Sequence, residues 1–476
     1  MRCGTNRAIF APVTLLALSL TACATPVPQA LTPTLVPKSF IGPVSAEAPV
    51  WPDATWWRAF RDPELAELVS AAQLNNRDLA AAAARVLQAE AQTKVQRAAL
   101  LPQLTSQVSR TSASCSGQAC LQYSSLKAYS LSFNASYELD VWGLARDNLR
   151  AAQEQLKSAR FARQALALSV TANTANQYFA VLAIRRRLAI AHEDIDAING
   201  ILEVIKLRVT AGATSQLDLA REEAQLEAVQ AQLPALETTE QESLFTLAAL
   251  LGRPPEGFAV AAQDLDGVAQ PEVGTGLPSD LLLRRPDVAQ AEANLAAAHA
   301  DVDAARAAFL PQISLTGSGG FISTAASALL QGSNFGYGYG ATLLQTIFDA
   351  GRLAGQKALA IGVQQEFVAD YQGAALNAFV DTENALVEVA NAHKAREHLK
   401  REVGAAREAF EIARLQYRQG ATDLLTVLQA QQTLFSAEDQ LAQITLANCQ
   451  AAVHLYEALG GGWVENAEDR TQFASN

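Results

Sequence analysis

Residues 129–141 have the sequence YSLSFNASYELDV, in which apolar and polar side chains alternate at every position. The odd-numbered positions, from Tyr129 to Val141, are apolar or aromatic, and the even-numbered positions are serine, asparagine or a carboxylate. Because successive side chains of a β-strand point to opposite faces, the pattern predicts a strand with one apolar and one polar face. Such a strand suits the wall of a membrane β-barrel, with lipid on one side and a polar lumen on the other.

The same alternation is found in the second half of the chain. Ile313, Leu315 and Phe321 alternate with polar side chains, and the aromatic residues of FGYGYG, residues 335–340, alternate with glycine. With a strand pair in each half, we expect four strands. The strands of a soluble β-sandwich have the same period. Four strands are too few, however, for a sandwich domain in a chain of 476 residues. The pattern therefore favours strands that form part of a membrane barrel.

Four short motifs occur twice, in the same order, at an offset of about 208 residues. They are AALLPQLT and AAFLPQIS (residues 98–105 and 307–314), LDVWG and FDAG (139–143 and 348–351), AGAT and QGAT (211–214 and 419–422), and ALLG and EALG (249–252 and 457–460). The chain is therefore predicted to be a tandem duplication. Each half is expected to contain a helix, a strand pair, a very long helix, a tight turn and a second long helix.

Two segments are expected to form very long helices. Residues 144–210 contain no proline and a single glycine, Gly200, and residues 353–419 are their proline-free counterpart. At the rise of an α-helix, each segment would extend roughly 100 Å. Helices of this length must pack side by side in coiled-coil-like bundles. A filamentous coiled coil would explain them too, but it would need no strands and no lipid anchor.

The N-terminus is typical of a bacterial lipoprotein precursor. Arg2 and Arg7 precede a short apolar stretch, and LTAC, residues 20–23, resembles the cleavage site of lipoprotein signals. Residues 1–22 are thus predicted to be a signal peptide, and Cys23 the site of lipid attachment. By resemblance to the sorting rules of enterobacterial lipoproteins, alanine at position 24, rather than aspartate, favours the outer membrane. Residues 23–62 follow as an extended linker, since residues 24–62 hold seven of the 17 prolines.

Composition argues against several classes of function. The net charge of −12 disfavours nucleic acid as a partner, because phosphate binding needs a basic face. Cys115 and Cys120 are spaced for a small disulfide loop, and Cys449 is expected to be a buried apolar residue. The cysteines show no metal-ligand spacing, the five histidines are scattered, and no phosphate-binding loop or nucleophile motif is visible. We expect no catalytic residue, metal or cofactor.

Four strands cannot close a barrel, since single-chain barrels begin at about eight strands. Open strand edges are not tolerated in lipid, because their backbone groups would lack hydrogen bonds. Several copies of the chain must therefore share one wall, although this reasoning does not give their number.

Two further motifs resemble a known family. WWRAFRDPEL (residues 56–65) and LPSDLLLRRPD (residues 277–287), with both LPQ junctions, are similar to TolC-like outer-membrane factors of the NodT lipoprotein type. The resemblance implies an α+β, mostly α fold: a trimeric channel-tunnel with a 12-stranded membrane β-barrel, a long periplasmic α-helical barrel of twelve helices and a small equatorial domain. It places one repeat at residues 63–270, the second at 271–462 and a tail at 463–476. The implied partners are a periplasmic adaptor protein and an inner-membrane RND-type pump.

The function expected from this resemblance is that of a passive outer-membrane exit duct of a tripartite efflux pump for small toxic compounds. The lipoprotein signal and the LRRPD motif favour it over the outer-membrane duct of a type I protein secretion system. A lipid-tethered periplasmic structural coiled coil is the alternative from another class.

The two helix–turn–helix tips hold the candidate contact residues. Gly212 and Gly420 can adopt positive φ and end a helix, while Thr214 or Ser215, and Thr422 or Asp423, can cap the next one. By resemblance, the tips meet the adaptor protein. The candidate contact residues are Arg208, Gly212, Thr214, Arg418, Gly420 and Thr422.

Charged residues near the second tip are candidates for a periplasmic gate: Glu411, Arg414 and Asp423. Glu411 and Arg414 are three residues apart on one helix, so a plain surface ion pair is the simpler interpretation of these two.

Overall fold

The computed structural model describes residues 37, 39–42, 51–114, 125–269, 271 and 278–463, all within one unit that begins at Pro37. The predicted signal peptide, Cys23, most of the linker and the pair Cys115 and Cys120 lie outside the described residues. Among the residues described, no helix combines the length and apolar character needed to cross a membrane.

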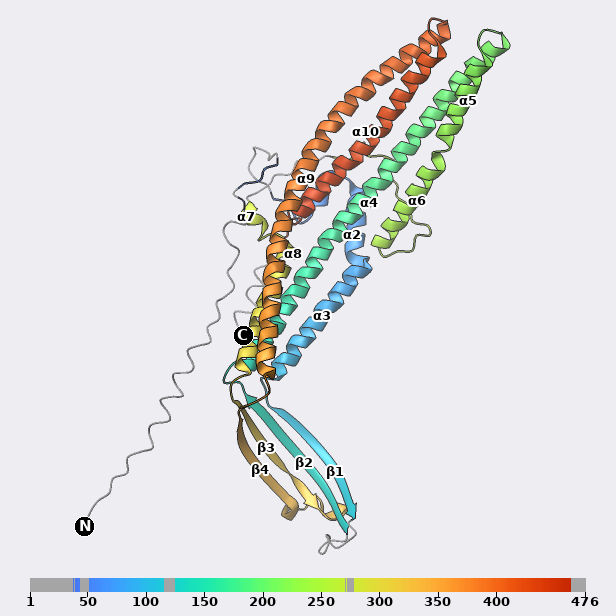
Figure 1. Ribbon diagram of the computed structural model, residues 1–476. Coiled ribbons are helices and arrows are strands. Elements are labelled where there is room, and N and C mark those ends of the chain that lie inside the picture. Colours follow the sequence, from blue (N-terminus) through green and yellow to red (C-terminus); the bar gives the residue numbers. More distant parts are fainter. Residues whose placement is uncertain are drawn as a thin grey trace, which may run out of the picture. The chain divides into compact units, whose positions relative to one another are not determined.

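The expected order of elements occurs twice (Figure 1). A short 3₁₀ helix, η2 (Trp56–Phe60), precedes the first half, and 3₁₀ turns η4 (Ala326–Ala328) and η5 (Gly332–Asn334) connect the strands of the second. The first half comprises α2 (Pro63–Asn75), α3 (Arg77–Ala98), β1 (Gln103–Ser114), β2 (Ser125–Leu139), α4 (Leu144–Thr210), α5 (Gln216–Gln230) and α6 (Leu233–Leu250). The second comprises α7 (Pro278–Leu281), α8 (Pro286–Ala307), β3 (Gln312–Ser323), β4 (Phe335–Leu344), α9 (Arg352–Gln419) and α10 (Leu424–Ala458). The predicted mostly helical fold with an internal repeat is confirmed.

The four strands form one antiparallel sheet in the order β1-β2-β3-β4. The central pair joins the two halves of the chain, with Leu131 opposite Phe321 and Tyr137 opposite Leu315. Strands β1 and β4 lie at the edges, and each pairs with one neighbour in the described part of the chain. The backbone groups on the outer sides of both edge strands are therefore left for another partner.

The strand register sorts the side chains of all four strands into two faces. Val108 of β1 lies opposite Leu131 of β2, and Gly319 of β3 lies opposite Tyr337 of β4. The even-numbered residues of β1 therefore share one face with the odd-numbered residues of β2, β3 and β4. One face is mainly apolar: Leu104, Val108, Tyr129, Leu131, Phe133, Tyr137, Ile313, Leu315, Phe321, Phe335, Tyr337, Tyr339 and Leu343. Ser106, Arg110 and Ser112 of β1 share this face, and the guanidinium of Arg110 lies 5.7 Å from the ring centroid of Tyr129. The other carries mainly polar residues and glycine: Gln103, Thr105, Gln107, Ser109, Ser130, Ser132, Asn134, Glu138, Ser314, Thr316, Ser318, Gly338 and Thr342.

Two helices, α4 with 67 residues and α9 with 68, run from the sheet to the tips. Helix α4 packs against α3, α5, α6, α8 and α10, and α9 packs against α8 and α10. Alanine supports both helices, because it has the highest helix propensity and permits close approach of neighbouring backbones. Many of the buried positions on α8, α9 and α10 are alanines.

The second arm of the first hairpin differs from the expected single helix. It is divided into α5 and α6, with a break at Ala231 and Gln232, whereas α10 is continuous. Pro234 lies in the first turn of α6. Proline lacks an N–H and clashes with the carbonyl four residues earlier, so it is tolerated in a first turn and ends any helix that precedes it.

A compact core surrounds the middle of α4, where Tyr178, Phe179 and Leu182 are fully buried. The motif WWRAF contributes Trp56, whose ring stacks on that of Tyr456 at 5.0 Å between centroids, together with Trp57 and Phe60. Further core residues come from the end of α6, the segment after it and α10: Leu247, Leu251, Val260, Leu265, Cys449 and Val453. The motif is thus a packing signature, and Cys449 is buried as predicted.

Candidate functional site

Each tip is a tight reversal built around a glycine. Gly212 and Gly420 have φ of 70° and 77°, so both adopt the left-handed conformation that favours glycine. The caps of the following helices are Ser215, whose side chain accepts from the backbone N–H of Asp218, and Asp423, whose side chain accepts from that of Thr426. Of the two residues considered at each tip, the second is therefore the cap.

An arginine joins the two tips. The guanidinium of Arg208, near the end of α4, lies over the ring of Tyr417 at 4.4 Å from its centroid. It also donates to the backbone carbonyl of Tyr417 at 2.5 Å and to that of Arg418 at 3.3 Å. These carbonyls belong to the last turn of α9, where cations are favoured by the helix dipole. Arg208 thus holds the end of α4 against the end of α9, a contact that the sequence did not reveal.

Both tips expose a matched pair of leucines. Leu207 and Leu217 lie five residues before and after Gly212, and Leu415 and Leu425 lie five residues before and after Gly420. Their exposed fractions are 73%, 58%, 57% and 50%, in that order. The same apolar side chains are therefore exposed at equivalent places in both repeats. The repeat offset and the helical spacing could have revealed this pattern, but the sequence analysis did not identify it.

The three candidate gate residues lie at the end of α9 and the start of α10. Arg414 donates to Glu411 at 2.5 Å, and the side chains are 36% and 54% exposed. The guanidinium of Arg414 also lies 5.8 Å from the ring centroid of Phe410. Asp423 caps α10, and the hydrogen bonds from the side chain and backbone of Thr426 hold its pKa below the ordinary value. Each of these contacts lies within the second hairpin.

The LRRPD motif forms a junction between helices. Arg285 is buried and donates to Asp287 at 2.7 and 3.0 Å, to Asp381 of α9 at 3.1 Å and to the carbonyl of Ala458 at 3.3 Å. Its pKa is raised, since the two carboxylates outweigh the burial that acts to lower it. The motif therefore holds the start of α8 to α9 and to the end of α10, which is a structural role.

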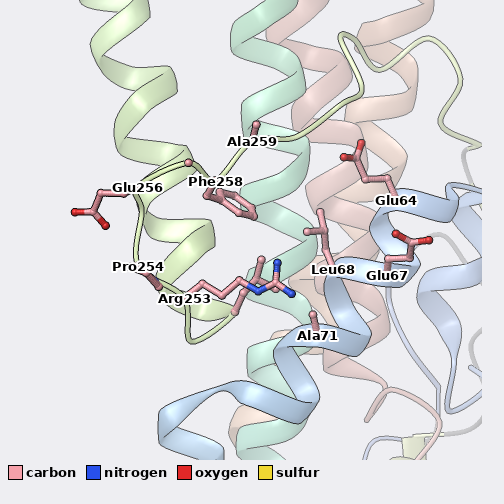
Figure 2. A pocket seen from close by; sticks show the side chains of 11 residues that line it. Glu64, Glu67, Leu68, Ala71, Arg253, Pro254, Glu256, Phe258 and Ala259 are labelled. Carbon is pink, nitrogen blue, oxygen red and sulfur yellow. The ribbon is translucent and has the colours of Figure 1, made fainter.

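A cavity of about 500 Å³ lies between α2 and the loop after α6 (Figure 2). Arg253 points into it, and Glu64 and Glu67 line the opposite wall. Glu64 is already engaged, because it accepts from the backbone N–H groups of Ala261 and Ala262 at 2.7 and 2.9 Å. This carboxylate fixes the loop to α2, so the cavity belongs to the framework around the core.

Comparison with known proteins agrees with this geometry. The sequence profile described as "Outer membrane efflux protein" matches residues 68–253 and 277–461, one segment in each repeat. The chain is 39% identical over 415 residues to the pyoverdine export outer membrane protein OpmQ of Pseudomonas aeruginosa, covering 86% of this chain and 87% of that protein. It is 38% identical to OpmQ of Pseudomonas putida, covering 96% and 98%.

Among solved structures, the Campylobacter jejuni CmeC outer membrane channel superposes with a TM-score of 0.86 at 25% identity. The match covers 94% of this chain and 97% of that one, so the likeness includes both the sheet and the long helices. On the double profile match and the identity to these relatives, the chain belongs to the outer membrane efflux protein family and is an outer-membrane channel protein of an efflux system.

Proposed function

We propose that three copies of this chain form one channel, each copy contributing its four-stranded sheet as one third of the wall of a 12-stranded membrane barrel. The observation that carries this proposal is the open sheet, with one apolar face, one polar face and two edge strands, β1 and β4, that lack a second neighbour in the described chain. Pairing β4 of one copy with β1 of the next would satisfy both edges and place the apolar face against lipid.

The polar face would line the duct, which makes the channel a passive exit path. Serine, threonine, asparagine and glutamine side chains on that face give a wet, weakly selective surface. The helices would continue the channel into the periplasm. Energy and choice of cargo would come from an inner-membrane RND-type pump, with a periplasmic adaptor protein between pump and duct.

The tips are the proposed place of contact with the adaptor. Exposed leucines at equivalent positions of both repeats are suited to bind apolar side chains of a partner, and exposed apolar patches mark such surfaces. They surround the candidate contact residues Arg208, Gly212, Thr214, Arg418, Gly420 and Thr422. Because the two tips have the same leucine spacing, one kind of partner hairpin could bind at each.

Glu411, Arg414 and Asp423 are proposed to take part in closing the periplasmic end. Their position beside the second tip supports the proposal, and like charges from symmetry-related copies would make a closed ring sensitive to salt. Lipid attachment at Cys23 is proposed to anchor the chain to the outer membrane, and Cys115 and Cys120 are proposed to close a disulfide loop.

For the cargo we propose small toxic compounds, as in resistance-type efflux. Siderophore export is a second candidate, because both OpmQ relatives are named for export of pyoverdine. Deletion of the gene tests these uses together. Loss of the duct should raise the cellular content of dyes and antibiotics, or of a siderophore, and wild-type chain should restore export. If the cellular content of dyes, antibiotics and siderophore stayed unchanged and a secreted protein were lost, the duct would serve protein secretion instead.

A further inference from the structure

Glu222 lies on α5, close to the first tip, and its side chain is fully buried, with an exposed fraction of 0%. Neither of its carboxylate oxygens has a hydrogen-bond partner. The residues on either side of it, Arg221 and Glu223, are exposed. A buried carboxylate without a partner is costly in its charged form, so the site favours the neutral acid.

The position of Glu222 is on the apolar face of α5 that packs against α4. Leu219 and Leu226, three residues before and four residues after it, are partly buried and pack against a buried cluster that includes Ile198 and Leu202 of α4. Residues at these spacings share one face of a helix. Glu222 therefore occupies a place in the α4–α5 contact that an apolar side chain would ordinarily fill.

A second buried carboxyl lies close by on α4. Asp194 is 7% exposed and accepts a hydrogen bond of 2.7 Å from the side-chain amide of Gln431 on α10, whose own carbonyl oxygen is buried without a partner. Burial, together with the charge of Asp194, raises the pKa of Glu222 to about 7. Burial also raises the pKa of Asp194 to about 6, although the bond from Gln431 acts in the opposite direction.

The other charged or titratable groups around this pair are engaged elsewhere. Glu438 of α10 forms an ion pair with Arg407 of α9, and Arg208 of α4 is bound to Tyr417 of α9. On α5 itself, the carboxylate of Asp218 accepts from the hydroxyl of Thr214, and its backbone N–H donates to the side chain of Ser215. The pKa of Asp218 is lowered chiefly by the bond from Thr214. The titratable groups that interact with Glu222 are thus Asp194 of α4 and Tyr417 of α9. Glu438 of α10 acts on Asp194, and Arg221 of α5 acts on Asp218.

The second repeat shows that the fold does not need an acid here. At the repeat offset of 208 residues, the counterpart of Glu222 is Ala430 of α10, a partly buried member of the apolar cluster between α4, α9 and α10. What Glu222 adds to the first hairpin is therefore the ability to gain and lose a proton inside its helix contact.

We propose that Glu222 is a proton-operated switch in the first hairpin: the neutral acid lets α5 pack against α4, and loss of the proton loosens this packing next to the Gly212 tip. The packing switch stands on the burial of an unpartnered carboxyl in the α4–α5 contact and does not depend on the proposed function. Its consequence for transport, control of the proposed adaptor contact at that tip, rests on the proposed function.

The sign of the pH effect follows from linkage. The pKa of Glu222 is higher in the packed state, at about 7, than in a solvated chain, where it is about 4.3. The packed state is fully favoured below the lower value and loses that advantage as the pH rises through about 7.

The test is hydrogen–deuterium exchange of the purified full mature protein, with labelling times corrected for the intrinsic effect of pH. The protection of backbone amides in residues 216–230 should fall about tenfold between pH 6 and pH 8 in the wild type, as linkage between the two pKa values requires. Glu222→Gln and Glu222→Ala, the second being the residue of the other repeat, should each give protection that does not change with pH. The matched control Glu223→Gln alters an exposed neighbour and should behave as the wild type does.

Wild-type protection that changes less than twofold, or a Glu222→Gln variant that keeps the wild-type pH response, would overturn the switch. A loss of the response in Glu223→Gln would do the same, because the effect would then not belong to the buried carboxyl. Conductance of the same preparation in planar bilayers separates the two proposals. A conducting channel without the exchange response rejects the switch alone, and an exchange response without conductance rejects the duct alone.

Discussion

Two glycines with the same backbone conformation have very different surroundings. Gly420 and Gly460 have φ of 77° and 82°, but a Cβ on Gly420 would have no neighbour within 4 Å, whereas one on Gly460 would lie 1.9 Å from the carbonyl oxygen of Arg284. Gly420→Ala should therefore lower the free energy of unfolding by about 1–2 kcal/mol, because alanine is strained in the left-handed conformation but meets no other atom. Gly460→Ala should cost about 3 kcal/mol or more, because the backbone of the LRRPD segment must also move.

Thermal unfolding of both variants, followed by circular dichroism, checks this difference. Equal losses would mean that the contact between Gly460 and Arg284 does not constrain the fold.

The Arg285 junction is the second residue-level test. Arg285→Ala removes a guanidinium that serves two carboxylates and one helix-end carbonyl. Because Asp287 and Asp381 are 42% and 43% exposed, water can partly replace it, and we expect a loss of about 2–3 kcal/mol, below that of a fully buried pair. Arg285→Lys keeps the charge without the two-pronged geometry and should lose less. Denaturant unfolding measures both, and a stability of Arg285→Lys below that of Arg285→Ala would contradict the assignment.

At the scale of elements, the two faces of the sheet make opposite predictions for adjacent residues. Phe133 lies on the apolar face and Ser132 on the polar face of β2. Phe133→Arg should prevent stable insertion, because a cation facing lipid near the middle of the membrane costs about 2–4 kcal/mol. Ser132→Arg should insert normally and change the ion selectivity of the channel. Outer-membrane fractionation measures the insertion of both variants, and bilayer recordings measure their ion selectivity. If Ser132→Arg failed to insert and Phe133→Arg inserted normally, the assignment of the two faces would be wrong.

The strands, the long helices and the tip reversals could be predicted because each has a local cause. The period-two alternation predicted the strands, the absence of proline predicted the long helices α4 and α9, and the glycines predicted the chain reversals at the tips. The division between α5 and α6 was missed, although Pro234 marked it, because the repeat suggested a copy of α10. The contact of Arg208 with Tyr417 and the burial of Glu222 depend on how distant helices pack, and no local pattern contains that information.

At the scale of the molecule, the unit carries a sheet that is too small to enclose a lumen and helices that are too long for an ordinary compact domain. Both features are explained when several copies assemble side by side, so that the edge strands of neighbouring copies pair and their long helices pack together. The number of copies cannot be read from one chain, since strand pairing fixes the need for a neighbour but not the curvature of the closed wall. Resemblance to the family supplied the number three.

Native mass spectrometry of the mature protein, released intact from detergent micelles, tests the shared wall most directly. The account predicts particles that contain three copies of the chain. Particles with a single copy would contradict it, because the edges of β1 and β4 would then have no partner within the membrane.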